Sequence, residues 1–213
     1  MTTSPTVATE MPTFALPGRW WRVPLETPEA TTASVRSMAR SLCPGDELAV
    51  LRRDVQERVS AAAAEATKAG ARAFHFAIEV VPGAPVPLTL GIYEPTLPPR
   101  LSAQGGALAS AEALAVSLRS AEPNAAVSSW GDDELGIVRV LSTQAPTADS
   151  EVDRPVLRAD YWLTAPATDA TTVFSFAAPV IWDQTAPALL ELLDAIISTV
   201  RWSPGGNAES DLA

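Results

Sequence analysis

The chain has 213 residues, 47% hydrophobic and 19% charged, a composition typical of one globular domain with a sizeable core. Fifteen basic residues against 25 acidic ones leave a net charge of -10, which repels both phosphate backbones and anionic lipid headgroups. We therefore expect no nucleic-acid partner and no membrane partner.

The two ends of the chain are predicted to be disordered tails. Residues 1–12 and 203–213 are small, polar and rich in proline or glycine, so they offer too little apolar surface to offset the entropy of ordering. One domain is expected over residues 13–202. Residues 1–18 contain no Lys or Arg and are interrupted by three prolines, which is unlike a secretory signal. The expected location is therefore the cytoplasm.

A first strand is predicted within residues 13–25, TFALPGRWWRVPL, which combine aromatic and β-branched side chains between prolines. Trp20 and Trp21 are adjacent, so a strand would point them to opposite faces of its sheet. We expect one of these two rings in the core and the other beneath a neighbouring element.

Two helices are predicted next. Thr27 and Pro28 are typical of a helix cap and a first helical position, and the apolar spacing continues to Leu42. The second helix is predicted over residues 46–70. Its expected buried stripe becomes rich in alanine and consists of Leu48, Leu51, Val55, Val59, Ala62 and Ala66. Such a stripe suits either close packing on a sheet or a coiled-coil seam. The shortage of leucines favours packing on a sheet.

Alternating hydrophobicity predicts the strands that follow. Residues 72–81 alternate with period two, and residues 86–94 do the same after a proline- and glycine-containing turn, which indicates a hairpin. A helix is expected over residues 105–120. Further strands are predicted at four segments: 125–130, 135–142, 156–164 and 171–177. Short loops between most of them favour antiparallel pairing.

A final amphipathic helix is predicted to close the domain. Its apolar stripe consists of Leu189, Leu192, Leu193, Ile196 and Val200. Polar residues, Asp194 among them, occupy the expected outer face, so the helix should lie on a sheet. The predicted fold is α+β, with a mainly antiparallel sheet of six or seven strands flanked by helices in an α/β/α sandwich.

The order of these elements resembles that of the PsbP/Mog-like fold family, which includes the photosystem II extrinsic protein PsbP and the Ran-binding nuclear-import protein Mog. The likeness rests on FALPGRWWRVPL at residues 14–25 and on the strand and LLDAIISTVRW helix within residues 174–202, and it is greatest to the small actinobacterial members. It implies the sandwich fold and a noncatalytic binding role. No motif that carries the resemblance is catalytic.

Few residues offer catalytic or metal-binding chemistry. His75 is the only histidine and Cys43 the only cysteine, so neither a histidine metal cluster nor an intrachain disulfide is possible. A Cys43 nucleophile paired with His75 is an alternative to structural roles for both. The consecutive carboxylates at 132–134 suit a turn better than a cation site, and the glycines at 105–106 suit a helix entry better than an anion site. We expect no cofactor and no bound metal.

One predicted sheet face mixes aromatic and charged side chains. If the strand alternations stay in register, this face presents His75, Tyr93, Arg139, Arg158, Asp160 and Trp162. Such a face is solvent-exposed, covered by the alanine-rich helix, or a recognition surface, since Trp, Tyr and Arg are enriched at binding hot spots. These six residues are the candidate partner-binding site.

The sequence therefore favours a noncatalytic protein-interaction module whose partner is another protein. By analogy with the resembled family, it would be an adaptor or accessory of a bacterial secretion or assembly system. Two alternatives stay open: a small-ligand binder with a cleft between sheet and helices, and a hydrolase with a carboxylate-based site. A concave pocket with convergent polar groups would favour the ligand binder.

Overall fold

The computed structural model describes residues 11–80, 87–96, 106–145, 155–165, 170–180 and 186–202. Apart from residues 11 and 12, both predicted tails lie outside these ranges. Two predicted loops also lie outside these ranges. They are most of the long polar loop before the predicted strand at 156–164 and the turn of the predicted hairpin at 81–86.

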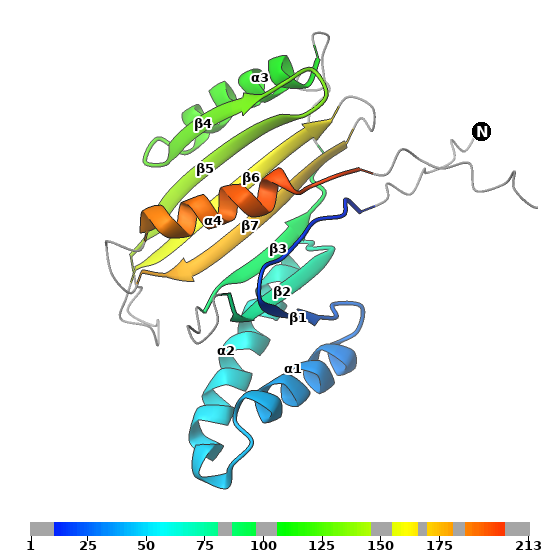
Figure 1. Ribbon diagram of the computed structural model, residues 1–213, viewed down its shortest axis with the longest axis vertical. Helices are drawn as coiled ribbons and strands as arrows, with labels where there is room; N and C mark the ends of the chain where they lie inside the picture. Colours follow the sequence, from blue (N-terminus) through cyan, green and yellow to red (C-terminus); the bar gives the residue numbers. More distant parts are fainter. Residues whose placement is uncertain are drawn as a thin grey trace, which may run out of the picture.

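A single antiparallel sheet of seven strands forms the centre of the protein (Figure 1). Its spatial order is β1-β2-β3-β7-β6-β5-β4, so the last four strands form a meander that joins the first three through β7. The strands are β1 (Arg19–Val23), β2 (Ala73–Glu79), β3 (Thr89–Tyr93), β4 (Ala126–Gly131), β5 (Gly136–Gln144), β6 (Val156–Ala165) and β7 (Ala170–Pro179). Together with the flanking helices, this sheet confirms the predicted α+β sandwich.

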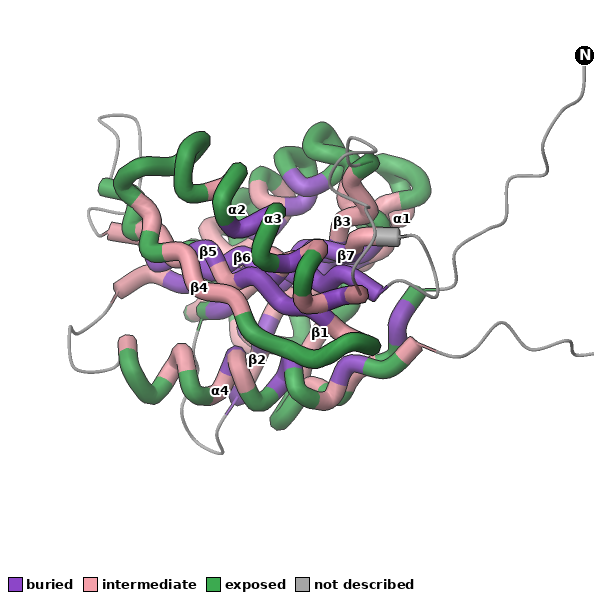
Figure 2. Tube along the Cα trace, turned by 90° about the horizontal axis from the view of Figure 1, so that it is seen from above, coloured by how far each residue is buried: buried purple, intermediate pink, exposed green. Residues whose placement is uncertain are grey.

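Helices cover both faces of the sheet, as Figure 2 shows from above. They are α1 (Pro28–Leu42), the short 3-10 helix η1 (Asp46–Leu48), α2 (Ala49–Lys68), α3 (Gly106–Ala121) and α4 (Ala186–Ser198). α4 lies on one face, and α1, α2 and α3 lie on the other. None of the helices in the described ranges has the length and apolar character needed to cross a membrane.

The larger part of the core lies between α4 and the sheet. Leu193, Ile196 and Ile197 are each at most 2% exposed and pack on the side chains that the central strands turn toward α4. These sheet residues include Leu90, Ile92, Tyr161, Leu163, Phe174 and Phe176. The predicted amphipathic lid is thus confirmed.

Two smaller cores lie on the opposite face, at the two ends of the sheet. α1 and α2 bury Val35, Met38 and Val59 against β1 and β2, where Trp21 and Phe74 contact them. At the other end, α3 buries an apolar cluster against β4 and β5. The consequence is a stretch of sheet between α2 and α3, over β3, β7 and β6, that no helix of the described chain covers fully.

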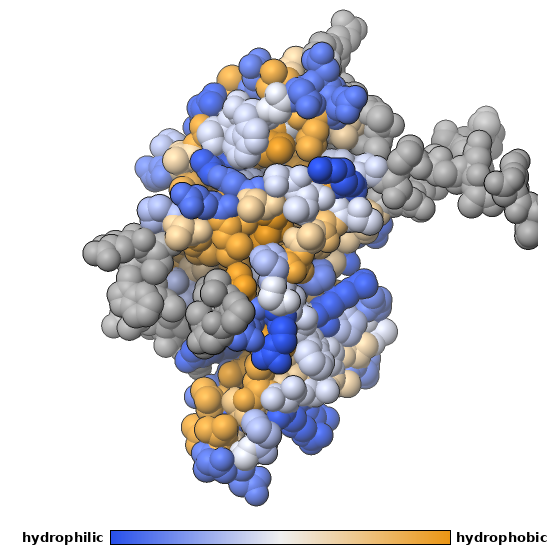
Figure 3. Space-filling view, viewed as in Figure 1, coloured by the Kyte–Doolittle hydropathy of each residue, from blue (hydrophilic) through white to orange (hydrophobic). Residues whose placement is uncertain are grey.

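Helix α1 begins at the predicted position. The hydroxyl of Thr27 accepts a hydrogen bond from the backbone N–H of Ala30 at 3.2 Å, and Pro28 occupies the first turn. The start of α2 differs from the prediction, because Leu51 was expected to be buried and is 50% exposed, next to Val50 at 75%. The first turns of α2 project past the sheet, and hydrophobic residues gather there in Figure 3.

The described ends of the domain lie side by side. Thr13 forms an isolated antiparallel bridge with Arg201, with both backbone N···O distances at 2.9 Å. Trp20 and Trp21 point to opposite faces as predicted: Trp20 packs in the α4 core and Trp21 in the α1/α2 core. The first and the last described segments of the chain therefore both pack against the α4 core.

Candidate functional site

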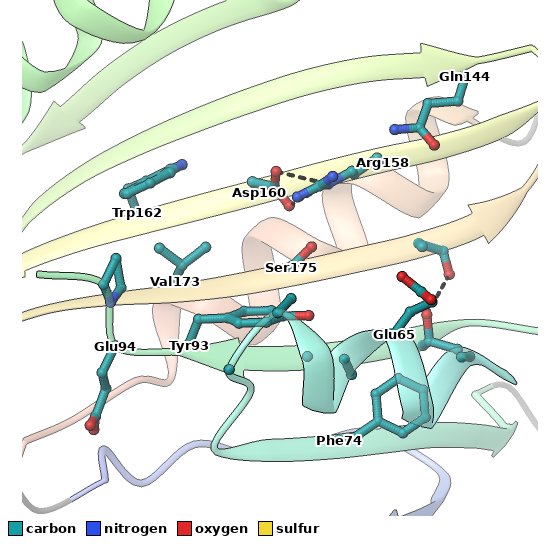
Figure 4. Close-up of a pocket in the computed structure, with 18 residues that line it drawn as sticks. Glu65, Phe74, Tyr93, Glu94, Gln144, Arg158, Asp160, Trp162, Val173 and Ser175 are labelled. Carbon is teal, nitrogen blue, oxygen red and sulfur yellow. Dashed lines mark hydrogen bonds and ion pairs between the residues drawn. The ribbon is translucent and has the colours of Figure 1, made fainter. Parts of the chain in front are cut away.

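The six candidate residues do not share one face of the sheet. Tyr93, Arg158, Asp160 and Trp162 lie together on the face of α2 and α3 (Figure 4). The expectation of a common face was wrong for the other two, His75 and Arg139.

The pairing register explains both misplaced residues. His75 lies opposite Leu90 in the β2–β3 ladder, and Leu90 belongs to the α4 core. Arg139 lies opposite Tyr161 in the β5–β6 ladder, and Tyr161 also belongs to that core. Directly opposite residues of an antiparallel pair point to the same face. His75 and Arg139 therefore face α4.

His75 is a neutral, partly buried side chain. Its ring meets the ring of Phe14 edge to face, with centroids 6.0 Å apart. Burial, together with the nearby charge of Arg22, lowers the pKa of His75 to about 4. Cys43, at the end of α1, lies on the other side of the sheet, so the two residues cannot form a catalytic pair.

Arg139 joins β5 to α4. Its Nη1 lies 2.9 Å from Oδ1 and 2.7 Å from Oδ2 of Asp194, and the hydroxyl of Tyr161 donates to the same Oδ1 at 2.7 Å. Burial, reinforced by this hydrogen bond to a carboxylate, raises the pKa of Tyr161. Asp194 was expected on the outer face of α4, and instead it reaches back to the sheet. These three side chains fix the helix on its platform.

The four remaining candidates line a groove in the opposite face of the sheet, which we call the central groove. Its floor consists of three rows that cross β6, β7 and β3. The rows are Trp162–Val173–Tyr93, Asp160–Ser175–Gly91 and Arg158–Ala177–Thr89. Large side chains occupy the first row and small ones the middle of the other two. The floor is therefore open around Ser175 and Ala177, next to the larger apolar side chains of the first row.

Helix α2 forms one wall of the central groove. Ala62 and Ala66 of α2, with Ala69 and Gly70 just after its end, line the groove, and their small size leaves the space open. Trp162 forms the other side, since its ring packs against the apolar cluster beneath α3. The resulting volume is about 710 Å³, within the roughly 300–1,000 Å³ of small-molecule sites.

Arg158 and Asp160 form an ion pair on the groove floor. Nε of Arg158 lies 3.1 Å from Oδ1 and 2.9 Å from Oδ2 of Asp160. The Asp160 side chain is 10% exposed and that of Arg158 is 47% exposed. Burial works against the charged guanidinium, but Asp160 outweighs it, so the pKa of Arg158 is raised. Arg158 therefore stays charged at neutral pH.

Tyr93 lies along the floor rather than standing away from it. A Cβ atom at Gly91 would come within 2.8 Å of a ring carbon and the hydroxyl oxygen of Tyr93, so the ring rests directly over the glycine. Figure 4 shows the ring in this position beside Ser175. Burial is the main reason why the pKa of Tyr93 is raised, so its hydroxyl is a hydrogen-bond donor.

Gly91, Val173 and Ser175 also line the groove, although the sequence did not predict them as site residues. Gly91 carried a usable signal, because a glycine inside a strand often marks the close approach of another group. Ser175 carried a weaker one, as a polar residue between two phenylalanines. Neither signal indicates which elements would stand on either side of the strand.

The other predicted sites behave as structural features. Oδ1 of Asp132 accepts backbone N–H bonds from Glu134 at 2.8 Å and Leu135 at 2.9 Å, and these bonds lower the pKa of Asp132. The acidic run therefore shapes the β4–β5 hairpin. Gly106 begins α3 with a φ of 86°, which agrees with a helix entry. Among the described residues, no group of three or more His, Cys, Asp or Glu side chains could hold a metal ion.

Comparisons with known proteins were made at three levels. Neither a protein-family model, nor a curated protein, nor a solved structure matches this chain. The central groove is therefore the feature that bears on function.

Proposed function

We propose that this protein is a noncatalytic binding protein and that its ligand, a small molecule, occupies the central groove. The observation that carries the proposal is the convergence of Tyr93, Arg158, Asp160 and Trp162 on one hollow of about 710 Å³. Concave shape, apolar rings and a few well-placed polar groups are the features of small-molecule sites. They favour the ligand binder over the protein-interaction module that the sequence ranked first.

A protein partner is the second candidate. Trp162, Tyr93 and Arg158 belong to the residue types that dominate interface hot spots. A stable protein interface buries roughly 1,200 Å² or more, so a protein partner would also have to contact the outer surfaces of α2 and α3. The adaptor role implied by the resemblance stays a prediction.

The test is a screen of small organic fragments against ¹⁵N-labelled protein by NMR. Fragments that bind in the central groove should shift the amide signals of β3, β6 and β7 around Ser175 and Gly91. Ser175→Phe fills the middle of the floor and should abolish these shifts. Ser117→Phe, at an exposed position of α3, is the matched control and should leave them unchanged.

Two outcomes would contradict the proposal. One is that no fragment in the screen perturbs the groove. The other is that fragments perturb the groove amides equally in the wild-type protein and in Ser175→Phe. A partner whose footprint extends over α2 and α3 would favour the second candidate.

A further inference from the structure

We propose that the ligand of the central groove is a flat aromatic acid with a single negative charge, whose carboxylate binds the guanidinium of Arg158 while its ring lies on the strip formed by Trp162, Val173 and Tyr93. This inference rests on the proposed function, because it names the class of molecule that the groove accepts. It is carried by the geometry of one ion pair and by the order of rows on the floor.

The ion pair leaves the end of the guanidinium free. Asp160 approaches Arg158 from the side, where Nε is the nearest nitrogen. In the described part of the chain, neither Nη atom of Arg158 makes a hydrogen bond. The two Nη atoms form the edge of a guanidinium that binds a carboxylate with two parallel hydrogen bonds. Arg158 is thus held in place with its binding edge unused.

Asp160 orients the Arg158 side chain through Nε and leaves its two Nη atoms for a ligand. Because Asp160 is buried and fixes the side chain through Nε, less rotamer entropy is lost when a ligand binds. The hydroxyl groups of Ser175 and Tyr93 lie on the same floor and make no hydrogen bond within the described residues. Both are available as further donors to an acid group.

The row next to this polar patch is apolar at Trp162 and Val173. Tyr93 begins in the same row on β3, and its ring extends over Gly91 in the next row. Aromatic side chains of this kind favour stacked or edge contacts with a ligand ring. Successive rows lie two residues apart along a strand, about 7 Å, so the Arg158 backbone lies two rows from the strip. The Arg158 guanidinium reaches back to Asp160 in the row between them. The remaining distance of about one row suits a fused ring with a short acid arm.

Charge limits the ligand to one negative group. Among the groove-lining residues that the structure describes, Arg158 is the one cation, and its charge is already balanced by Asp160. Glu65 on the wall of α2, Glu122 near Arg158 and the net charge of -10 all oppose further negative charge. A phosphate monoester, which carries about two charges at neutral pH, is therefore disfavoured relative to a carboxylate.

The experiment compares four probes that share one ring. They are 2-naphthylacetate, the neutral 2-naphthylacetamide, the cationic 2-naphthylethylamine and 2-naphthyl phosphate, each titrated by NMR and calorimetry. The acetate should bind at least about tenfold more tightly than the acetamide, the usual size of a charge-assisted hydrogen bond. The phosphate and the amine should both bind more weakly than the acetate.

Two variants test whether Arg158 is responsible. The double variant Arg158→Gln with Asp160→Asn keeps the shapes and leaves no buried charge unpaired, and it should bind the acetate and the acetamide equally. Arg158→Lys keeps the charge and loses the paired donor edge, so it should lose most of the preference for the acid. Arg36→Gln, at an exposed position of α1, is the control and should keep it.

Each outcome supports or overturns the inference. Equal binding of acetate and acetamide to the wild-type protein would overturn it, and so would tighter binding of the phosphate or a preference for the acid that survives in the double variant. In these cases binding in the groove, and with it the proposed function, still stands. If no naphthyl probe binds, the inference fails, and the fragment screen decides the proposed function separately.

Discussion

Asp194 of α4 is bound by Arg139 of β5 through both of its carboxylate oxygens, at 2.9 and 2.7 Å. The same carboxylate accepts the hydroxyl hydrogen bond of Tyr161, a residue with 0% exposure. The guanidinium of Arg139 also lies 5.5 Å from the ring centroid of Trp130, within the range of a cation–π contact. These contacts set the position of α4 on the sheet and make it testable.

Replacing Asp194 by Ala should lower the free energy of unfolding by about 2 kcal/mol, because the buried hydroxyl of Tyr161 loses its acceptor. Loss of the ion pair with Arg139, which is partly exposed to solvent, should add little to this decrease in stability. Chemical denaturation of Asp194→Ala, Tyr161→Phe and the double variant measures the coupling. Glu191→Ala, on the exposed side of α4, should change stability by less than about 0.5 kcal/mol. Additive effects of the two substitutions would contradict a direct hydrogen bond.

Removing α4 should unfold the domain. Leu193, Ile196, Ile197 and Val200 are all at most 2% exposed, and burial of four such side chains contributes roughly 6–12 kcal/mol. This is comparable with the whole stability of a typical domain, about 5–15 kcal/mol. A chain ending at residue 180 should show no cooperative thermal transition by circular dichroism. A chain ending at residue 202 keeps every contact described above and should show one.

A single substitution in the same interface gives a graded test. Ile196→Ala should cost about 2–5 kcal/mol, because the core cannot fully close around the missing methyl groups. Urea denaturation measures the loss. A cost below about 1 kcal/mol would mean that α4 does not pack on the sheet as described.

His75 should make stability depend on pH. Its pKa is about 4 in the folded protein, lowered by burial and by Arg22, against about 6.5 in an unfolded chain. Between these values the unfolded state binds the proton more readily, so the free energy of unfolding falls as the pH falls from 6.5 to 4. The contribution is fully present above pH 6.5. Since this is the only histidine, an NMR titration of its ring protons follows it directly.

The matched variant is His75→Phe, which keeps a ring beside Phe14 and cannot titrate. Its stability should decline less than that of the wild-type protein over the same pH range. A ring titration near pH 6.5 in the folded wild-type protein would show that His75 is not buried against the α4 core.

Gly91→Ala should disturb the central groove without unfolding the protein. The added methyl group meets the far end of the Tyr93 side chain, so the ring must leave its place on the floor. The NMR signals of the Tyr93 ring should shift, and 2-naphthylacetate should bind about tenfold or more weakly. Ser129→Ala on β4, away from the groove-lining residues, is the control. Unchanged affinity in Gly91→Ala would mean that the position of Tyr93 does not shape the site.

Much of the fold could be predicted from local patterns. Helices α1, α3 and α4 and all seven strands agree with the spacing of apolar residues, and Trp20 and Trp21 face opposite sides as their adjacency requires. A strand has period two and a helix 3.6, so each element indicates its own buried side. The buried half of α2 follows the same rule, whereas its first turns do not, because they extend beyond the sheet.

The candidate site was only partly within reach of the sequence. Arg158, Asp160 and Trp162 alternate with core residues of β6, so their common face is a property of one strand. Whether His75 or Arg139 shares that face depends on how neighbouring strands pair, and a shift by one residue reverses every side chain. Alternation within a strand cannot supply this information.

The amino-acid sequence by itself determined the elements, the apolar side of most of them, and the net charge of -10. Tertiary structure decided the register that sends His75 and Arg139 toward α4 and the spacing that leaves the central groove open beside α2. The physical reason is that periodicity is a local property of the backbone, whereas register and the placement of helices over a sheet come from contacts between residues far apart in the chain.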